Sequence, residues 1–283
     1  MVFVFNKTSV VYHDIFNYPL RKDELKTWYT PLRLKNSKLK VTSKNNFFFL
    51  KGRSEIIKKR LENERHSNRK LKIAKRAANL ISKIPTVLFV GLTGSLAMRN
   101  AGKDSDIDLM IITKKNQLWT TRFLVYAALF FSDFKIRRPN EFDEKDRLCI
   151  NIWLDIENLS WPREDRNVYT AHEILQIDPL VDRYDVVNLF SRENAWALKY
   201  WPNAPLLSKV NTSFNDKGPL IISLDEPSIF KKIYDYVEKI LFCLQCFYMK
   251  NKKTSEVVLT GRAIFHPKDW SKVVFKKLSK IKF

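Results

Sequence analysis

The stretch VLFVGLTGSLAMRNAGKDSDIDLMIIT, residues 87–113, decides the fold of this chain. It reads as an apolar strand, a Gly94-Ser95 turn, a short helix, a second turn and another apolar strand. Because side chains alternate between the two faces of a strand, Asp106 and Asp108 point the same way, whereas Ile107 points into the core. The stretch therefore predicts two neighbouring carboxylates that face a tight turn following another strand.

The residue types in this pattern are those that bind a metal ion and phosphates. Two neighbouring carboxylates repel each other, and a divalent cation bound by their oxygens removes that penalty. Backbone N–H groups at Gly94 and Ser95 can approach a triphosphate closely, and the helix that begins there offers its positive end. Taken separately, a Gly-Ser turn and an Asp-x-Asp pair also occur on ordinary surface turns and strand edges. Their combination at this spacing is more specific.

This combination resembles the signature of the nucleotidyltransferase-fold superfamily, the DNA polymerase beta-like group. The resemblance covers residues 86–155 and implies a Mg²⁺- or Mn²⁺-dependent transfer of NMP from an NTP to an acceptor hydroxyl, with release of pyrophosphate. It assigns Asp106 and Asp108 to catalysis and metal binding, and it leaves the acceptor open among nucleic acid, protein side chain and small molecule. The nucleotide phosphates would contact four residues, Gly94, Ser95, Arg99 and Lys103.

The resemblance also implies a third acidic residue from a later strand. Residues 148–155 read as that strand, and their alternation gives one face the side chains Cys149, Asn151, Trp153 and Asp155. Asn151 then lies mid-strand where the carboxylate is expected, and Asp155 lies about 13 Å further along at ~3.3 Å per residue. Asp155 is the candidate third catalytic carboxylate, and Asp146 is an alternative. An Asn in this place weakens metal affinity and turnover without changing the fold.

The rest of the chain divides into two flanking parts. Residues 1–54 are expected to form a winged-helix-like basic module of two short helices, a basic loop at residues 33–40 and a strand; the alternative is a cap that packs on the next domain. Residues 55–160 are expected to form the nucleotidyltransferase-fold domain, including a long helix whose polar middle, residues 62–70, is solvated or bent. Residues 161–283 are expected to form an all-helical domain. The predicted fold class is α+β, with a small mixed sheet.

The net charge of +21 is concentrated at the two ends of the chain. Lys and Arg exceed Asp and Glu by 15 in residues 1–85 and by 9 in residues 228–283, whereas residues 86–227 carry an excess of three acidic side chains. Basic flanks beside a nucleotide site suggest RNA or DNA as a partner besides the NTP. The alternative is a Lys-rich composition that follows from AT-rich coding sequence.

The remaining composition favours a cytoplasmic protein without a membrane segment. The longest apolar run, residues 123–131, is shorter than the ~20 residues that span a bilayer. Three cysteines and no signal-like N-terminus indicate a reducing setting. Cys243 and Cys246 form a single C-x-x-C inside an apolar helix, which predicts buried thiols rather than a zinc site.

A function of another class remains open from these residues. The domain could keep its fold and no longer turn over, and the chain would then act as a regulatory module that binds nucleic acid or a partner protein. Asn151 in the strand of the third carboxylate favours this reading.

Overall fold

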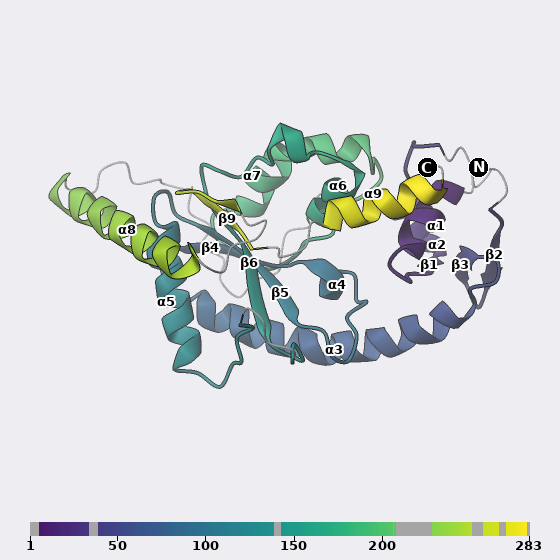
Figure 1. Ribbon diagram of the computed structural model, residues 1–283, viewed down its shortest axis with the longest axis horizontal. Coiled ribbons are helices and arrows are strands. Elements are labelled where there is room, and N and C mark those ends of the chain that lie inside the picture. Colours follow the sequence, from purple (N-terminus) through teal and green to yellow (C-terminus); the bar gives the residue numbers. More distant parts are fainter. Residues whose placement is uncertain are drawn as a thin grey trace.

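The computed structural model describes residues 6–33, 39–138, 143–205, 207, 228–250, 257–265 and 270–281. Its centre is a mixed six-stranded sheet with helices on both faces (Figure 1). The N-terminal residues form a separate three-stranded sheet. The expected α+β fold class is therefore confirmed.

The middle of the large sheet comes from the apolar segments that the sequence singles out. The strands β4 (Val87–Leu92) and β5 (Ile107–Thr113) are antiparallel neighbours, and β6 (Leu148–Asp155) runs parallel to β5. All of β4 and most of β5 and β6 are buried. Such continuous burial requires cover on both faces of the sheet, which explains the near-continuous apolar sequences.

Helices cover both faces of this sheet (Figure 1). One hydrophobic cluster joins α3 (Glu55–Ile81) and α5 (Leu118–Phe130) to the strands. A second cluster joins α6 (Val168–Leu175) and α7 (Val186–Glu193) to the opposite face. The sheet is therefore the middle layer of three.

The polar middle of α3 is unbent and solvated on one face only, because Asn63, Ser67 and Lys70 are buried whereas Glu62, Arg65, Asn68 and Arg69 are exposed; the predicted bend and the predicted full solvation were therefore wrong. The helix runs unbroken through 27 residues, and the side chains of Arg60, Asn63, Ser67 and Lys70 lie on one face and are buried. The Lys70 ammonium donates to the carbonyl oxygens of Lys103 at 3.1 Å and Ser105 at 2.7 Å. This face of α3 therefore holds the loop that leads into β5.

Residues 161–283 are mainly helical, but the expectation of an all-helical segment needs a correction. The strand β7 (Asp178–Asp182) pairs with β4, and β9 (Arg262–Ile264) with β8 (Val257–Val258) extends the sheet beyond β6. These strands are two to five residues long, too short for a clear alternation of polar and apolar residues. The other elements are helical: η1 (Arg163–Asp165), η2 (Ala195–Lys199), α8 (Ser228–Met249) and α9 (Trp270–Ile281).

The N-terminal segment has the element order helix, strand, helix and hairpin. The elements are α1 (Lys7–Asp14), β1 (Leu20–Arg21), α2 (Lys22–Thr27), β2 (Val41–Lys44) and β3 (Phe47–Leu50), with β3 paired to both other strands. This order agrees with the winged-helix-like module, which stays a prediction. The basic loop at residues 33–40 lies mostly outside the described residues, which omit 34–38.

The N-terminal segment shares its core with the C-terminal helices. One hydrophobic cluster contains Tyr12 and Trp28 together with Trp201 and Val274. In α9, the Lys277 ammonium donates to the carbonyl oxygen of Ile15 at 3.4 Å. The N-terminal segment and α9 therefore lie side by side, whereas α8 lies at the other end of the molecule (Figure 1). The domain boundaries at residues 54 and 160 remain predictions.

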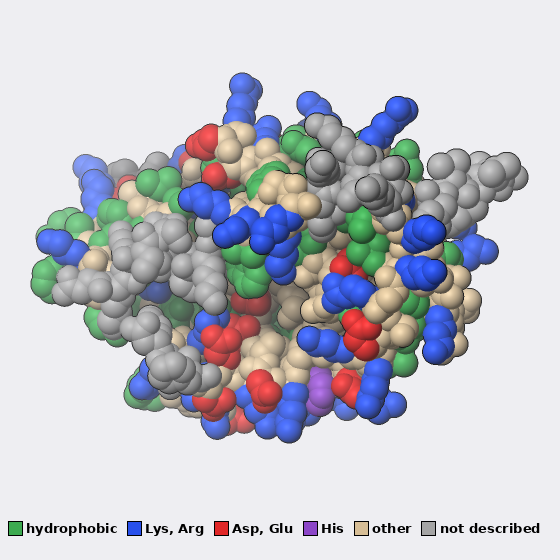
Figure 2. All heavy atoms as spheres, turned by 45° about the vertical axis from the view of Figure 1, so that its right-hand side comes forward, with side chains coloured by type: hydrophobic (Ala, Val, Ile, Leu, Met, Phe, Trp, Pro, Cys, Tyr) green, Lys and Arg blue, Asp and Glu red, His purple; other side chains and the backbone are tan. Residues whose placement is uncertain are grey.

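The surface is charged over much of its extent. Figure 2 shows Lys and Arg side chains spread across one face, with groups of Asp and Glu among them. Among the described helices, none combines the length and the apolar character that crossing a membrane requires.

Candidate functional site

The turn after β4 is built around Gly94. This residue begins the short helix α4 (Gly94–Ala97) with a φ of +60°, in the left-handed region that favours glycine. A Cβ at this position would lie 2.6 Å from Oδ2 of Asp108. The missing side chain therefore lets the turn approach the carboxylate closely. Ser95, the next residue, is exposed at the surface of the turn.

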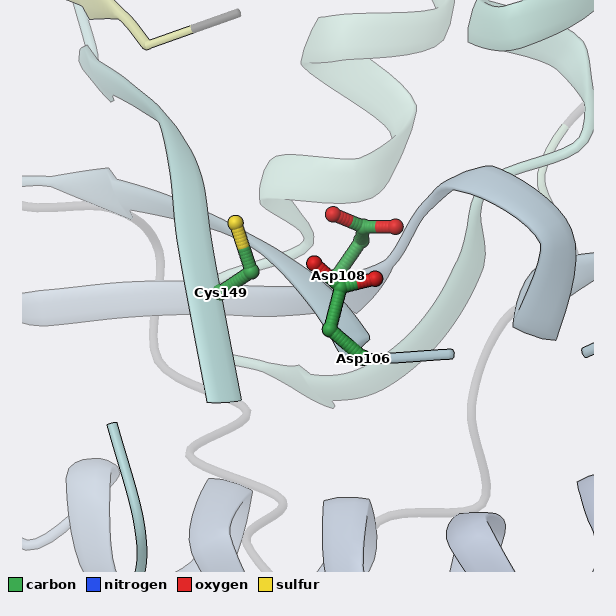
Figure 3. A group of neighbouring side chains, drawn as sticks. All are labelled: Asp106, Asp108 and Cys149. Carbon is green, nitrogen blue, oxygen red and sulfur yellow. The ribbon is translucent and has the colours of Figure 1, made fainter. Parts of the chain in front are cut away.

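Asp106 and Asp108 lie together at the beginning of β5, as predicted (Figure 3). Between them, Ile107 is fully buried in the core. The backbone N–H of Thr93 donates to the carbonyl oxygen of Asp108 at 3.1 Å, which fixes the turn against the strand. The structure therefore brings the two halves of the sequence motif into one place.

A cysteine from the neighbouring strand completes this cluster. Cys149 is the register partner of Asp108 in the parallel pair of β5 and β6. Its sulfur and one carboxylate oxygen from each of Asp106 and Asp108 all lie within 4.8 Å of one another. Figure 3 shows the three side chains grouped on the same side of the strands. Sequence reasoning placed Cys149 on the face of Asn151 and gave it no role.

Each carboxylate of the pair already has a polar partner. The Arg137 guanidinium Nη1 lies 2.6 Å from Oδ2 of Asp106, and its Nη2 contacts Glu144. The amide Nδ2 of Asn151 donates to Oδ1 of Asp108 at 2.7 Å. Arg137 has no specific signal in the sequence, since its contact with Asp106 spans 31 positions.

The electrostatics of the cluster favour binding of a cation. Burial raises the pKa of Asp108 well above its usual value, and the nearby charges of Asp106 and Glu173 raise it further. Burial also raises the pKa of the Cys149 thiol, with Asp108 and Asp106 adding to the effect. A divalent cation would offset both the lost hydration and the mutual repulsion of these groups.

The residues of the cluster fit a metal ion on a further observation. The Oδ1 atom of Asn151 and the Oγ1 atom of Thr93 are buried and have no hydrogen-bond partner in the described part of the chain. Both residues adjoin Asp108. Unpartnered buried oxygens are costly unless a further group satisfies them, so the site has unused capacity for oxygen coordination or substrate contact.

The structure does not bring Asp155 to the cluster. Asp155 is the register partner of Thr113 at the far end of β5, and its Oδ1 accepts hydrogen bonds from Asn158 at 2.7 Å and from the backbone N–H of Glu157 at 3.0 Å. The register of β5 and β6 also shifts between Leu109 and Met110. This irregularity breaks the alternation that sequence reasoning assumed.

The consequence appears in the packing of the strand after Asn151. Trp153 packs in the cluster on the side of α3 and α5, with Ile150. Ile152 and Leu154 pack on the side of α6 and α7. The expectation that Ile150 and Ile152 share a face was therefore wrong, and so was the grouping of Asn151 with Trp153.

The alternative third carboxylate, Asp146, forms ion pairs with α3 and does not lie in the cluster. Its Oδ1 pairs with the buried Lys70 at 2.7 Å and its Oδ2 with Arg69 at 2.7 Å. These contacts tie α3 to the segment before β6. Neither acidic candidate reaches the cluster, whereas the side chains of Asn151 and Cys149 in β6 both lie at Asp108.

The two predicted phosphate contacts lie on the segment between the motif halves. Arg99 pairs with Asp178 of β7 at 2.7 Å and is part-exposed. Lys103 has an exposed side chain, while its carbonyl oxygen accepts from Lys70. Among the described residues, neither side chain forms a hydrogen bond or ion pair with Asp106 or Asp108.

Glu173 is a further acidic residue near the cluster that the sequence did not single out. It lies on α6, and its Oε1 accepts from Nε2 of Gln176 at 2.7 Å. Burial raises the pKa of Glu173 to about 7. Its charge acts on Asp108 across the space between α6 and the sheet.

Comparison with known proteins agrees with this geometry. Residues 75–158 match the family model described as polymerase beta, nucleotidyltransferase. This segment, which contains β4, α4, β5 and β6, is therefore a nucleotidyltransferase domain. No curated protein and no solved structure matches the chain.

Proposed function

We propose that the protein transfers NMP from an NTP to an acceptor hydroxyl in a reaction that depends on a divalent cation. The observation that carries this proposal is the convergence of Asp106 and Asp108 against the Gly94 turn. The acceptor hydroxyl releases its proton to solvent, its oxygen forms a bond to the α-phosphorus, the bond from that phosphorus to the bridging oxygen breaks, and pyrophosphate leaves. Nucleotidyltransferase-type activity is what a domain of this family supports.

Asp106 and Asp108 would hold the cation, for which the sequence predicts Mg²⁺ or Mn²⁺. When bound, such an ion neutralises phosphate charge and orients the reacting oxygens. Gly94 lets backbone approach the phosphates, and the exposed hydroxyl of Ser95 can donate to a phosphate oxygen. Arg99 and Lys103 would neutralise the charge of the departing pyrophosphate, Arg99 by exchanging its contact with Asp178.

A polyanion such as RNA or DNA is the acceptor that the charge distribution favours. In the basic C-terminal segment, α9 lies beside the basic N-terminal segment, which brings part of their positive charge together. A pocket of about 430 Å³ between the N-terminal segment and α4 is lined by Arg21, Arg60 and Arg99. Guanidinium groups bind phosphates in a bidentate manner. Glu24 and Glu64 of the same pocket already pair with Arg21 and Arg60, so an acceptor phosphate would bind here, close to the nucleotide turn, by exchanging with these carboxylates.

The cytoplasm is the setting that we propose for this reaction. Cys149, Cys243 and Cys246 are all free thiols, as expected in a reducing compartment.

The experiment is a transfer assay with each α-labelled NTP, Mg²⁺ or Mn²⁺, and separate pools of RNA, protein and metabolites. Wild type is compared with Asp106→Asn, Asp108→Asn and the matched control Asp104→Asn, which changes an exposed carboxylate in the preceding loop. We expect label transfer by wild type and the control and none by the other two variants. Activity that survives both site changes would sink the proposal.

A second candidate function is supported by the partners of the carboxylates. Arg137 contacts one oxygen of Asp106, and Asn151 contacts one oxygen of Asp108. Asn151 also brings no negative charge to the site. These contacts favour a domain that has kept the fold without turnover and binds nucleic acid or a partner protein. Retention on RNA with a steep salt dependence, together with no label transfer for any NTP, would support this candidate.

A further inference from the structure

Cys149 changes the chemistry of the carboxylate pair. Its sulfur comes from β6, directly beside Asp108, and lies within 4.8 Å of an oxygen atom of each carboxylate. Sulfur binds Mg²⁺ poorly, because Mg²⁺ prefers oxygen ligands. Thiolate ligands favour borderline and soft cations, including Zn²⁺. The cluster is therefore better matched to such an ion than a set of oxygen ligands alone.

We propose that Asp106, Asp108 and Cys149 form a site for a thiophilic divalent cation of the Zn²⁺ type. The proposal rests on the proposed function only in that both use Asp106 and Asp108 as metal ligands. Three protein ligands with one open position are typical of catalytic zinc sites. In this arrangement the open position takes an oxygen of the substrate, and Mg²⁺ enters as the counterion of the triphosphate.

The distances allow this coordination with small movements. Zinc bonds to sulfur are about 2.3 Å long and its bonds to oxygen are about 2.0–2.2 Å. Ligand atoms that already lie within 4.8 Å of one another therefore need to move by about 1 Å or less to share one ion. The thiol releases its proton to solvent as the metal–sulfur bond forms.

Asn151 gives an independent indication of a ligand at this place. Its side chain is 4% exposed, its amide points at Asp108, and its Oδ1 has no partner in the described residues. The two ends of an amide are assigned from their hydrogen bonds. Rotation of this amide would present Oδ1 to an ion held by Asp108. The ion would then be a partner for an oxygen that is otherwise buried without one among the described residues.

Arg137 explains how the cluster is balanced before a cation binds. Its Nη1 lies 2.6 Å from Asp106 and 4.0 Å from the sulfur of Cys149, so its charge faces two of the three ligands. Its Nη2 contacts Glu144. A cation that binds Asp106 would displace Nη1, and Glu144 would keep the guanidinium in place nearby.

The first test uses Co²⁺, which replaces Zn²⁺ and reports a sulfur ligand by its near-ultraviolet charge-transfer absorption. We expect this band for wild type and for Cys243→Ser, which removes an exposed thiol elsewhere. We expect no band for Cys149→Ser. Co²⁺ binding without the band in wild type, or a band that persists in Cys149→Ser, would overturn the proposal.

The second test measures selectivity by titration calorimetry with Zn²⁺ and Mg²⁺. Loss of the sulfur in Cys149→Ser should weaken Zn²⁺ binding on the order of 100-fold, with little change for Mg²⁺. Cys149→Asp should bind Mg²⁺ more tightly than wild type and lose the preference for Zn²⁺. Unchanged relative affinities in both variants would overturn the proposal even if either variant is less stable.

These outcomes separate the inference from the proposed function. Label transfer that needs Asp106 and Asp108, combined with a wild type that prefers Mg²⁺ and shows no cobalt–sulfur band, would refute the zinc-type site alone. A cobalt–sulfur band without label transfer would support the site and refute the transferase. Wild type that binds no divalent cation in either test and transfers no label from any NTP would refute both.

Discussion

Replacing Asn151 by Asp introduces a negative charge on the strand where a third carboxylate is expected. The wild type has an uncharged amide at this position. In the wild type, the Asn151 amide donates to Asp108 Oδ1 at 2.7 Å. The new carboxylate has no proton to donate when ionised, so the hydrogen bond becomes a repulsive contact between two buried oxygens. Asn151→Asp should therefore destabilise the metal-free protein and make its stability depend on added metal.

Two estimates give the same magnitude for this loss. Two unit charges about 4 Å apart in a partly buried site repel by about 4 kcal/mol. The alternative is to keep one carboxyl protonated, which costs at most about 4 kcal/mol at pH 7 for a group with an ordinary pKa near 4, and less because burial already raises the pKa of Asp108. A loss of this size lowers the unfolding temperature by about 8–16 °C for a domain of 150–250 residues.

The assay is thermal unfolding of the variant and the wild type, first in EDTA and then with Mn²⁺. A cation bound by Asp106, Asp108 and the new carboxylate should recover much of the lost stability. Metal at about 100 times its dissociation constant contributes about 2.7 kcal/mol. We expect a larger upward shift with Mn²⁺ in the variant than in the wild type.

The control is Asn158→Asp. The Asn158 amide donates to Asp155 Oδ1 at the same 2.7 Å, but it lies at the other end of β6 and is exposed. This variant should lose little stability and gain none from Mn²⁺. Equal metal responses in the two variants would refute the assignment of Asn151 to the carboxylate site.

Three further predictions test the turn, the buried lysine and the residue facing the cluster. Gly94→Ala should lower the free energy of unfolding by about 1–2 kcal/mol, because residue 94 has a left-handed conformation. It should also weaken metal binding, measured by calorimetry, because the new Cβ displaces Asp108. An unchanged metal affinity would contradict the close approach of the turn to Asp108. Lys70→Met removes the donor to three oxygens and should cost about 1–3 kcal/mol in denaturant unfolding. Lys72→Met, which changes an exposed neighbour, is the comparison. Because burial raises the pKa of Glu173 to about 7 from 4.5, the folded protein retains a proton that the unfolded chain releases, so stability should fall as pH rises through this window. Glu173→Gln should flatten that fall, and an unchanged pH profile would contradict the burial effect.

The centre of the fold could be predicted because its information is local. The apolar runs of β4 and β5 and the residues Gly94, Asp106 and Asp108 lie within 27 consecutive positions, and strand alternation alone puts the carboxylates together. The polar stretch of α3 could not be read in this way. Lys70 looks solvated until its partner Asp146 is known, and that partner is 76 positions away.

The prediction of the third carboxylate was wrong for a different reason. A period-two pattern assigns faces only while the strand stays regular, and the irregular register beside Asn151 reverses the parity of Trp153 and Asp155. Cys149 precedes this irregularity, so strand alternation could assign its face. Its closeness to Asp106 could not be predicted, because it depends on the register between β5 and β6. The outer strands β7, β8 and β9 are too short for any period to be recognised.

The strand order has a consequence for synthesis of the chain. The neighbours β4, β5 and β6 are complete by residue 155, but β9, which covers the outer edge of β6, follows more than 100 residues later at Arg262–Ile264. An unpaired strand edge is a template for pairing with other chains, and contacts between distant segments form slowly. The nascent protein therefore exposes the apolar edge of β6 for much of its translation, and we expect its yield to depend on chaperones that protect this edge.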